Sequence, residues 1–390
     1  MDGTAVAMMV ESRATNPVLS MIEASTGPRS DLSPTPATVV ATHNPFPHGH
    51  HRPDSTPSHS ETFPAGGSCD PPGVVNPIEV FCWTAQSRRR NLVVPPLAAM
   101  EGTTMRTRRI GDAEVSAIGL GAMPMSIEGR PDEARSIATI HAALDAGVTL
   151  VDTADAYHSY AGEVGHNESL IARALAGYGG DTTGVLIATK GGHLRPGDGS
   201  WTVNGSPAYL EQACDASLKR LGVDAIGLYQ FHRPDPKVPF ADSIGALRDL
   251  LDAGKIRMVG ISNVSPEQIR QANEILGGRL ASVQNQFSPA VRDSEAALRL
   301  CAELGIAFLP WSPLGGRSVA GVLGTRFAAF AEIARAHEVS PQRVCLAWLL
   351  AKGPAVIPIP GSTRPETIRD SAAAAELALS AGELARLDAS

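Results

Sequence analysis

The sequence lacks the features that define several classes of protein. It contains no run of about 18 apolar residues, the length that a membrane-spanning helix needs, although 43% of its 390 residues are hydrophobic. It also has no excess of basic residues, because 33 Lys and Arg against 40 Asp and Glu give a net charge of -7. A dedicated nucleic-acid binder usually carries a basic surface. We therefore expect neither a membrane nor a nucleic acid as a partner.

Cysteine and aromatic residues are scarce as well. The five cysteines are widely separated and form no C-x-x-C pair, so neither a disulfide framework nor a structural zinc site is expected. A reducing compartment fits best, and we predict a cytoplasmic protein that is a monomer by default. An aromatic content of 5% does not indicate an extensive aromatic cage. The length alone leaves one or two domains open.

Residues 1–104 differ in composition from the rest of the chain. They hold 14 of the 30 prolines, five of the 11 histidines and no lysine, and their apolar residues follow neither a helical nor a strand period. Such a segment cannot bury enough apolar surface to offset its chain entropy, so we predict a disordered, low-complexity leader. His48, His50 and His51 could hold a metal ion, but a solvated tract is the preferred interpretation. We hypothesise that the leader is a mis-assigned start or a dispensable tail.

Residues 105–390 show a regular alternation of short apolar runs and longer amphipathic segments. The apolar runs lie at 115–120, 150–153, 185–189, 226–231, 258–261, 282–286, 307–311 and 355–359. The segments with a helical period lie at 132–146, 163–176, 207–221, 240–254, 266–276, 293–304, 341–352 and 365–376. Eight strand–helix pairs over this length predict an α/β fold, a closed (β/α)₈ TIM barrel, as one domain.

The helix boundaries carry their own signals. Ser206, Ser265 and Ser340 each precede a proline, which places serine at the N-cap and proline at the first helical position. An open, doubly wound sheet is the alternative fold. It would require a G-x-G-x-x-G turn after the first strand, but Gly119-Leu-Gly121-Ala-Met-Pro124 has proline in place of the third glycine.

Polar residues follow the predicted strands, at the barrel end where active sites form. In chain order these positions hold Asp152 with Tyr157 five residues on, Lys190, His232, Ser262-Asn263, Gln284, Trp311-Ser312 and Gly361-Ser362-Thr363. A buried lysine is costly unless it is paired, so we expect Lys190 to pair with Asp152. For these two residues alone, a purely structural ion pair that closes the end of the barrel is as good an interpretation as a catalytic role.

Tyr157 and His232 indicate a catalytic site instead of a plain ion pair. A cation next to a phenol stabilises the phenolate and lowers the phenol's pKa, so we expect Lys190 to make Tyr157 a proton donor near neutral pH. A histidine at a neighbouring strand end can hydrogen-bond a carbonyl oxygen and fix its orientation. Either residue alone would more often be a core or rim residue, whereas four such types on one face indicate a site.

These residues lie in motifs that resemble the aldo-keto reductase family. The matching pieces are Leu120-Gly-Ala-Met123, Val151-Asp-Thr-Ala-Asp-Ala-Tyr157, Ile187-Ala-Thr-Lys190, Leu228-Tyr-Gln-Phe-His232, Gly260-Ile-Ser-Asn263, Val283-Gln-Asn-Gln286, Pro310-Trp-Ser-Pro-Leu314 and Ile359-Pro-Gly-Ser-Thr-Arg364. The resemblance implies a barrel that reduces an aldehyde or ketone with a nicotinamide cofactor and without a metal. It assigns Tyr157 as general acid, Asp152 and Lys190 as the pair that tunes it, and His232 as the group that orients the carbonyl.

The resemblance also implies where the cofactor binds. The implied residues are Gly121, Ala122, Met123, Ser262, Asn263, Gln284, Trp311, Ser312, Leu314, Gly316, Gly361, Ser362, Thr363, Arg364 and Asp370. Hydroxyls, a helix N-terminus and the Arg364 guanidinium suit a ribose 2′-phosphate, which favours NADPH, with NADH possible. Many family members carry lysine, arginine and asparagine where this chain has Gly361, Thr367 and Ser371, so Arg364 is left to hold the phosphate alone.

The substrate remains open at this level beyond a small-molecule carbonyl compound. We expect the loop 191–208 to line the pocket and to close over it. The candidate pocket residues are Met125, His193, Trp201, Arg233 and Phe287. Two alternatives to a reductase remain. One is a cofactor-binding regulatory or partner subunit resembling the potassium-channel β subunits. The other is a non-redox barrel enzyme that uses Lys190 as a Schiff base.

Overall fold

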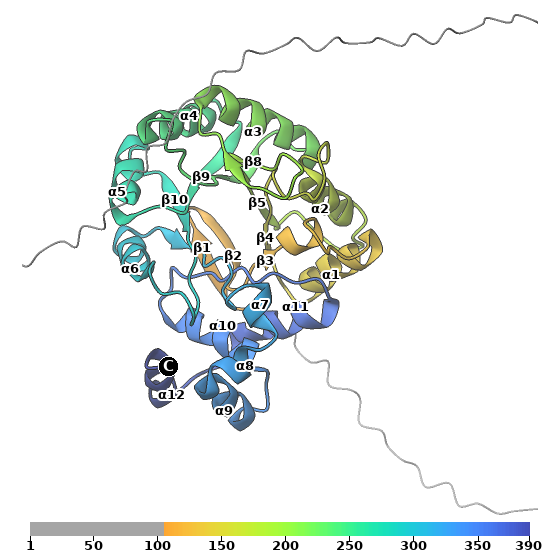
Figure 1. The fold of residues 1–390 in the computed structure, drawn as a ribbon, viewed down its shortest axis with the longest axis vertical. Helices are drawn as coiled ribbons and strands as arrows, with labels where there is room; N and C mark the ends of the chain where they lie inside the picture. Colours follow the sequence, from red (N-terminus) through yellow and green to blue (C-terminus); the bar gives the residue numbers. More distant parts are fainter. Residues whose placement is uncertain (1–104) are drawn as a thin grey trace, which may run out of the picture. The chain divides into compact units, whose positions relative to one another are not determined.

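The computed structural model describes residues 105–390, and its centre is a parallel sheet that curls into a barrel (Figure 1). Seven strands follow one another in the order β11-β10-β9-β8-β5-β4-β3. Their bounds are β3 (Leu120–Gly121), β4 (Leu150–Asp152), β5 (Leu186–Gly191), β8 (Ile226–Phe231), β9 (Ile256–Ser262), β10 (Leu280–Gln284) and β11 (Ala307–Phe308). Every neighbouring pair in this sheet is parallel.

The segment 355–361 closes the barrel by joining its two edge strands. It forms one parallel bridge to β11, between Phe308 and Val356, and one to β3, between Gly121 and Gly361. The predicted (β/α)₈ barrel is therefore confirmed, but its eighth strand is a pair of bridges instead of a continuous ladder. Pro358 and Pro360 have no amide hydrogen to donate, which interrupts the regular pairing of a strand.

The first predicted strand, 115–120, is wrong as one element. Its beginning belongs to β2 (Ala113–Ser116), which pairs antiparallel with β1 (Thr107–Ile110), and only its end belongs to the barrel strand β3. Ile110 and Val115 of this hairpin are buried in the same apolar cluster as Leu150 and Leu228. The hairpin therefore closes the amino-terminal end of the barrel, and a continuous strand would have left that core open.

Eight helices surround the barrel as a ring, each inside a segment predicted to be helical (Figure 1). They are α1 (Glu133–Asp145), α2 (His166–Ala176), α3 (Pro207–Leu221), α4 (Phe240–Asp252), α5 (Pro266–Ile275), α6 (Glu295–Leu304), α10 (Pro341–Ala351) and α11 (Pro365–Ala372). Ser265 and Ser340 cap α5 and α10 through their side chains, as expected, while Ser206 forms no such bond at α3. Its hydroxyl donates to Asn204 instead.

Several short elements were not predicted. They are the 3₁₀ turn η1 (Met123–Met125), the hairpin β6 (His193–Leu194) and β7 (Thr202–Val203), and the helices α7 (Arg317–Ala320), α8 (Leu323–Arg326), α9 (Ala328–Ala336) and α12 (Ala381–Asp388). The end of the predicted helical segment 365–376 is a separate 3₁₀ turn, η2 (Ala373–Glu376). Helices α8, α9 and α12 lie outside the ring, next to α10 (Figure 1). The loops with α7 and the β6–β7 hairpin belong to the carboxyl ends of strands, where function resides in such barrels.

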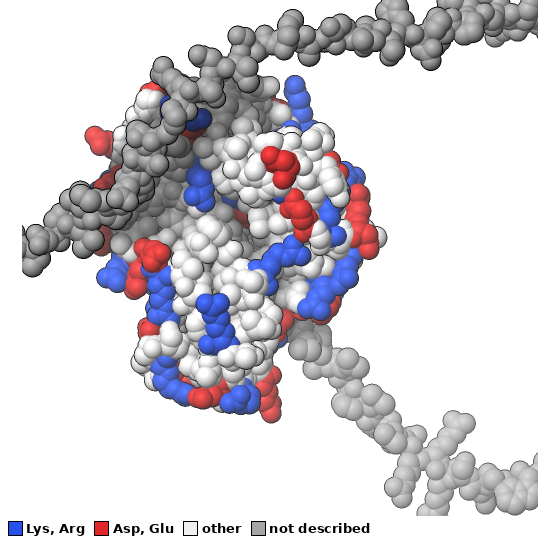
Figure 2. All heavy atoms as spheres, viewed as in Figure 1, with Lys and Arg blue, Asp and Glu red and all other residues white. Residues whose placement is uncertain are grey.

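The predictions for residues 1–104 and for a membrane partner can be compared with the described residues only in part. The predicted disorder of residues 1–104, and the interpretation of their histidines, lie outside the described residues. Within residues 105–390, no helix combines the length and the apolar character needed to cross a membrane. On the face viewed in Figure 1, acidic and basic side chains of the described residues are interspersed (Figure 2).

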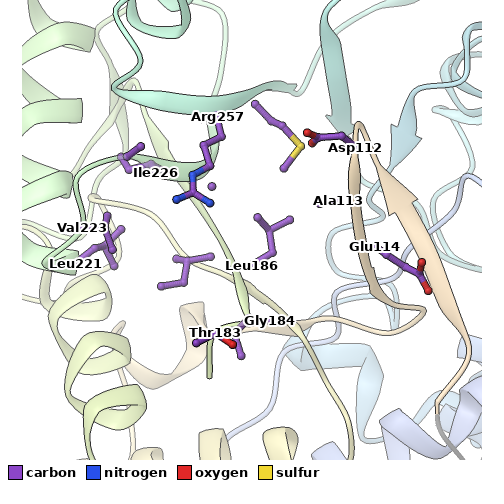
Figure 3. A pocket seen from close by; sticks show the side chains of 15 residues that line it. Asp112, Ala113, Glu114, Thr183, Gly184, Leu186, Leu221, Val223, Ile226 and Arg257 are labelled. Atoms are coloured by element: carbon purple, nitrogen blue, oxygen red, sulfur yellow. The ribbon is translucent and has the colours of Figure 1, made fainter. Parts of the chain in front are cut away.

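Two cavities lie at opposite ends of the barrel. The smaller, of about 460 Å³, is at the amino ends of β5, β8 and β9, where Arg257, Leu186 and the hairpin residue Asp112 are among the lining residues (Figure 3). The larger, of about 720 Å³, is lined by residues at the carboxyl ends of the strands. Because barrels of this kind do chemistry at their carboxyl ends, the larger cavity is the candidate active site.

Candidate active site

Three of the four predicted catalytic residues are joined by direct hydrogen bonds. The Lys190 ammonium lies 2.6 Å from Oδ1 of Asp152 and 3.1 Å from the Tyr157 hydroxyl, and it donates to the carbonyl of Thr153 at 2.7 Å. Its three hydrogens thus have three acceptors. Lys190 is fully buried, so the pair with Asp152 offsets the cost of removing its charge from water.

The strand register brings these side chains together. β4 and β5 are adjacent and parallel, with Asp152 opposite Ala188. Lys190 lies two residues beyond Ala188, so both side chains leave the sheet on the same face. Tyr157 follows β4 by five residues and returns over the strand end. The sequence therefore fixes this cluster through the ends of two neighbouring strands.

The second carboxylate oxygen of Asp152 is held by two glutamines. Gln284 donates to it at 2.7 Å and Gln230 at 3.3 Å. Gln230 and the Thr153 carbonyl were absent from the predicted site. A usable signal for Gln230 was its place on the apolar strand 226–231, two residues before His232 and therefore on the same face.

The pKa of Tyr157 corrects one expectation. Burial raises the pKa of this phenol, and the attraction of Lys190, which acts in the opposite direction, does not compensate, so the pKa lies above its ordinary value. Burial also lowers the pKa of Lys190, but Asp152 and Tyr157 outweigh it, so the ammonium stays charged. The structure thus holds Tyr157 as a neutral phenol with its proton in place. Lys190 does lower the pKa of Tyr157, as predicted, but the prediction that the pKa lies below its ordinary value is wrong.

His232 completes the group on the other side of the cleft. Its ring meets the Tyr157 ring edge-on, with centroids 5.6 Å apart, and lies over the ring of His193 at 4.2 Å. Burial, followed by the charge of Lys190, lowers the pKa of His232 well below its ordinary value. The imidazole is therefore neutral near pH 7 and can donate one hydrogen bond.

Asp152, Tyr157 and His232 line the cleft, which extends from them towards the predicted cofactor positions, whereas Lys190 is buried and is not a lining residue. The predicted cofactor residues that line the cleft are Gly121, Met123, Ser262, Asn263, Gln284, Trp311, Ser312, Leu314, Gly316, Gly361, Ser362 and Thr363. Asn263 and Ser312 have φ angles of 60° and 48°, a backbone conformation that is costly for residues other than glycine. Strain of this kind gathers at functional sites, which supports a ligand-binding role for the cleft.

Three predicted cofactor residues lie elsewhere. Ala122 is fully buried, and its carbonyl accepts a hydrogen bond from Asn167. Asp370 is not a lining residue, because its carboxylate is paired with Arg343 at 2.6 Å and accepts from Ser340. The expectation that Asp370 binds the cofactor is therefore corrected. The Arg364 side chain is about half exposed and lies 3.4 Å from Glu366 at the start of α11.

The substrate side of the cleft contains only part of the predicted set. His193, Trp201 and Arg233 line it, and the loop 191–208 that carries the first two is folded as the β6–β7 hairpin. The guanidinium of Arg195 lies 4.4 Å from the centre of the Trp201 ring, a contact that joins the two sides of the hairpin. Val203, another lining residue, also belongs to this loop, whereas Ile127 and Arg317 were not predicted because neither follows directly on a strand end.

Met125 and Phe287 were wrongly predicted as pocket residues. Met125 is 1% exposed and packs in the cluster with Leu120 and Ile140. Phe287 is fully buried, with its ring stacked on Trp348 at 6.0 Å. Within residues 105–390, no three His, Cys, Asp or Glu side chains are grouped so as to hold a metal ion.

Comparisons with known proteins agree with this geometry. The model of the aldo/keto reductase family matches residues 117–390, and the chain belongs to that family. It is 35% identical over 295 residues to the uncharacterised oxidoreductase C215.11c of Schizosaccharomyces pombe, covering 75% of this chain and 92% of that protein. It is 34% identical over 299 residues to the probable aldo-keto reductase 1 of Glycine max, covering 70% of this chain and 84% of that protein.

A solved structure shares the fold. The aldo/keto reductase from Klebsiella pneumoniae, in complex with NADP and acetate, superposes with a TM-score of 0.61 at 28% identity, covering 73% of this chain and 95% of that one. Family and relatives together support an oxidoreductase activity in general.

The position of Phe287 yields a stability prediction. Replacing it with alanine removes a ring from the core, and we expect the free energy of unfolding to fall by about 3–5 kcal/mol, as for other buried aromatic residues. Urea denaturation followed by far-UV circular dichroism measures this loss. The folded variant should keep the wild-type KM for its carbonyl substrate. A variant with wild-type stability and a strongly raised KM would show instead that Phe287 contacts the substrate.

Proposed function

We propose that this protein reduces an aldehyde or ketone to an alcohol with NADPH, and that Tyr157 donates the proton. The observation that carries the proposal is the buried hydrogen bond between the Lys190 ammonium and the Tyr157 hydroxyl, at the wall of the larger cavity. The bond fixes the phenol oxygen, and the neutral state of Tyr157 leaves its proton available for transfer.

The residues of the cleft fit a nicotinamide dinucleotide. Trp311 offers an aromatic face, and its indole nitrogen has no hydrogen-bond partner among the described residues. Gly315 and Gly316 have φ angles of 82° and 81°, so the loop exposes backbone amides that can approach a pyrophosphate closely. Ser362 and Thr363 precede α11, whose N-terminus favours an anion. The NADP found in the Klebsiella pneumoniae reductase supports the same ligand here.

The chemistry divides between the cofactor and the chain. A bound reduced nicotinamide would supply a hydride to the carbonyl carbon. Tyr157 gives its hydroxyl proton to the carbonyl oxygen, so an alcohol forms, and Lys190 stabilises the phenolate left behind. His232 donates a hydrogen bond to the same oxygen and orients the carbonyl. Both groups bind the developing alkoxide more strongly than the ketone, which lowers the barrier.

The intact set of four residues favours an enzyme over a regulatory subunit. A protein that only senses or holds the cofactor has no need of a proton donor. The Schiff-base alternative is also disfavoured, because the Lys190 ammonium is held charged by three acceptors and is no free nucleophile.

Replacing Tyr157 with phenylalanine tests the proton donor. The change removes one oxygen and keeps the ring, so we expect kcat for small aldehydes to fall by about 10²–10⁴-fold. Loss of NADPH absorbance measures turnover. Quenching of tryptophan fluorescence should show that the cofactor still binds. Wild-type turnover in this variant would refute the assignment of Tyr157.

Replacing Arg364 with alanine tests the cofactor preference. The guanidinium stands at the start of α11, where a 2′-phosphate would lie next to the helix N-terminus. We expect the Kd for NADPH to rise by about 10-fold or more, the size of a charge-assisted hydrogen bond, while the Kd for NADH changes little. Titration of the two cofactors in parallel makes the comparison. Equal losses for both would count against a phosphate contact.

A further inference from the structure

Arg233 is an unpaired cation at the mouth of the substrate side of the cleft. It follows the proposed carbonyl-orienting residue His232 directly in the chain, its side chain is exposed, and it lines the cavity. Its Nε donates to Nε2 of His193 at 3.2 Å. Among the described residues, no carboxylate lies within ion-pair distance of it, in contrast to Arg130 and Arg195, which pair with Glu163 and Glu128. A neutral acceptor therefore orients the Arg233 guanidinium without neutralising it.

Arg233 differs from the other charged residues of the cavity in what surrounds its side chain. The charged residues that line the cavity are Asp152, Arg233 and Arg317. Asp152 is balanced by Lys190. Arg317 also has no carboxylate partner among the described residues, but its guanidinium donates to the carbonyl of Glu128 at 2.8 Å, whereas Arg233 adjoins the neighbouring rings of His193 and His232.

The remaining titratable groups of the substrate side are neutral near pH 7. Burial lowers the pKa of His193 to about 4, and the neighbouring Arg233 and Lys190 act in the same direction. His232 and Tyr157 are neutral for the reasons given above. Arg233 is therefore the cation next to the two neutral histidine rings, and its charge attracts an anion towards this side of the cleft.

The rest of this wall is apolar. Ile127, Trp201 and Val203 line it, so the body of a substrate would be held by apolar contacts. The rings of His193 and His232 lie between Arg233 and the Tyr157 hydroxyl, with a spacing of 4.2 Å between the two ring centres. An anionic group that reaches Arg233 must thus be separated from the reacting carbonyl by several bonds.

We propose that the preferred substrate is an aldehyde that carries a carboxylate several bonds from its carbonyl, and that Arg233 binds this carboxylate. The inference rests on the proposed reductase function. Arg233 would act in substrate specificity, through the two terminal nitrogens that its bond to His193 leaves free. A guanidinium binds a carboxylate with two parallel hydrogen bonds, which fixes the direction of the substrate as well as its charge.

Matched substrates test the proposal. The probes are 4-carboxybenzaldehyde and its neutral methyl ester, which share the aldehyde, the ring and nearly the same length. We expect wild-type kcat/KM to be about 10-fold higher for the acid, mainly through KM, the ratio given by one charge-assisted contact. Added KCl should reduce this preference, because salt screens an exposed guanidinium.

Variants of Arg233 separate its charge from its hydrogen bond. Arg233→Gln keeps a donor for His193 but loses the charge, and we expect the acid-to-ester ratio to fall to near one. Arg233→Lys keeps the charge and should retain most of the preference. Arg257→Gln is the matched control, because Arg257 lines the cavity at the opposite end of the barrel, and it should leave the ratio unchanged.

The outcomes distinguish this inference from the function on which it rests. A wild-type enzyme that reduces the ester in a Tyr157-dependent way but shows no preference for the acid would overturn only the role of Arg233. The same holds if Arg233→Gln keeps the wild-type ratio. If neither aldehyde is reduced in a Tyr157-dependent way, the proposed function fails and this inference fails with it.

Discussion

The ion pair of Lys190 and Asp152 is the interaction on which the site depends. An ammonium without exposure to water is tolerated only when its charge and its hydrogens are matched, and here Asp152, Thr153 and Tyr157 match them. Gln284 in turn holds the second oxygen of Asp152. The buried ammonium needs three acceptors, and the Tyr157 hydroxyl is one of them. Its position is therefore fixed by the same hydrogen bonds that stabilise the buried lysine.

Closure of the barrel sets this pair in a cavity instead of on an open sheet edge. The segment 355–361 joins β11 to β3, and this brings Gly361 beside Gly121, whose register partner on the other side is Asp152. The β1–β2 hairpin fills the amino-terminal end with Ile110 and Val115. The larger cavity therefore lies at the carboxyl ends of the strands, where Arg233 and Arg317 are among its lining residues.

The sequence predicted the barrel and the four central residues because both are set by local rules. Apolar runs alternate with capped helices, and Asp152, Lys190 and His232 lie at or next to the carboxyl ends of buried strands. Prediction failed where contact between distant segments decides the outcome. Phe287 is three residues past a strand end, yet its ring turns inward onto Trp348, and the carboxylate of Asp370 is taken by Arg343. The net pKa of Tyr157 depends on burial, which the sequence does not reveal.

A double-mutant cycle on Asp152→Asn and Lys190→Met tests the central claim most directly, with kcat for reduction of one aldehyde as the readout and circular dichroism as the control for folding. If Asp152 acts only by holding Lys190 against the Tyr157 hydroxyl, its loss should matter little once Lys190 is gone. The double variant should then be about as slow as Lys190→Met alone. Losses that multiply across the two substitutions would contradict a single buried unit that positions the phenol.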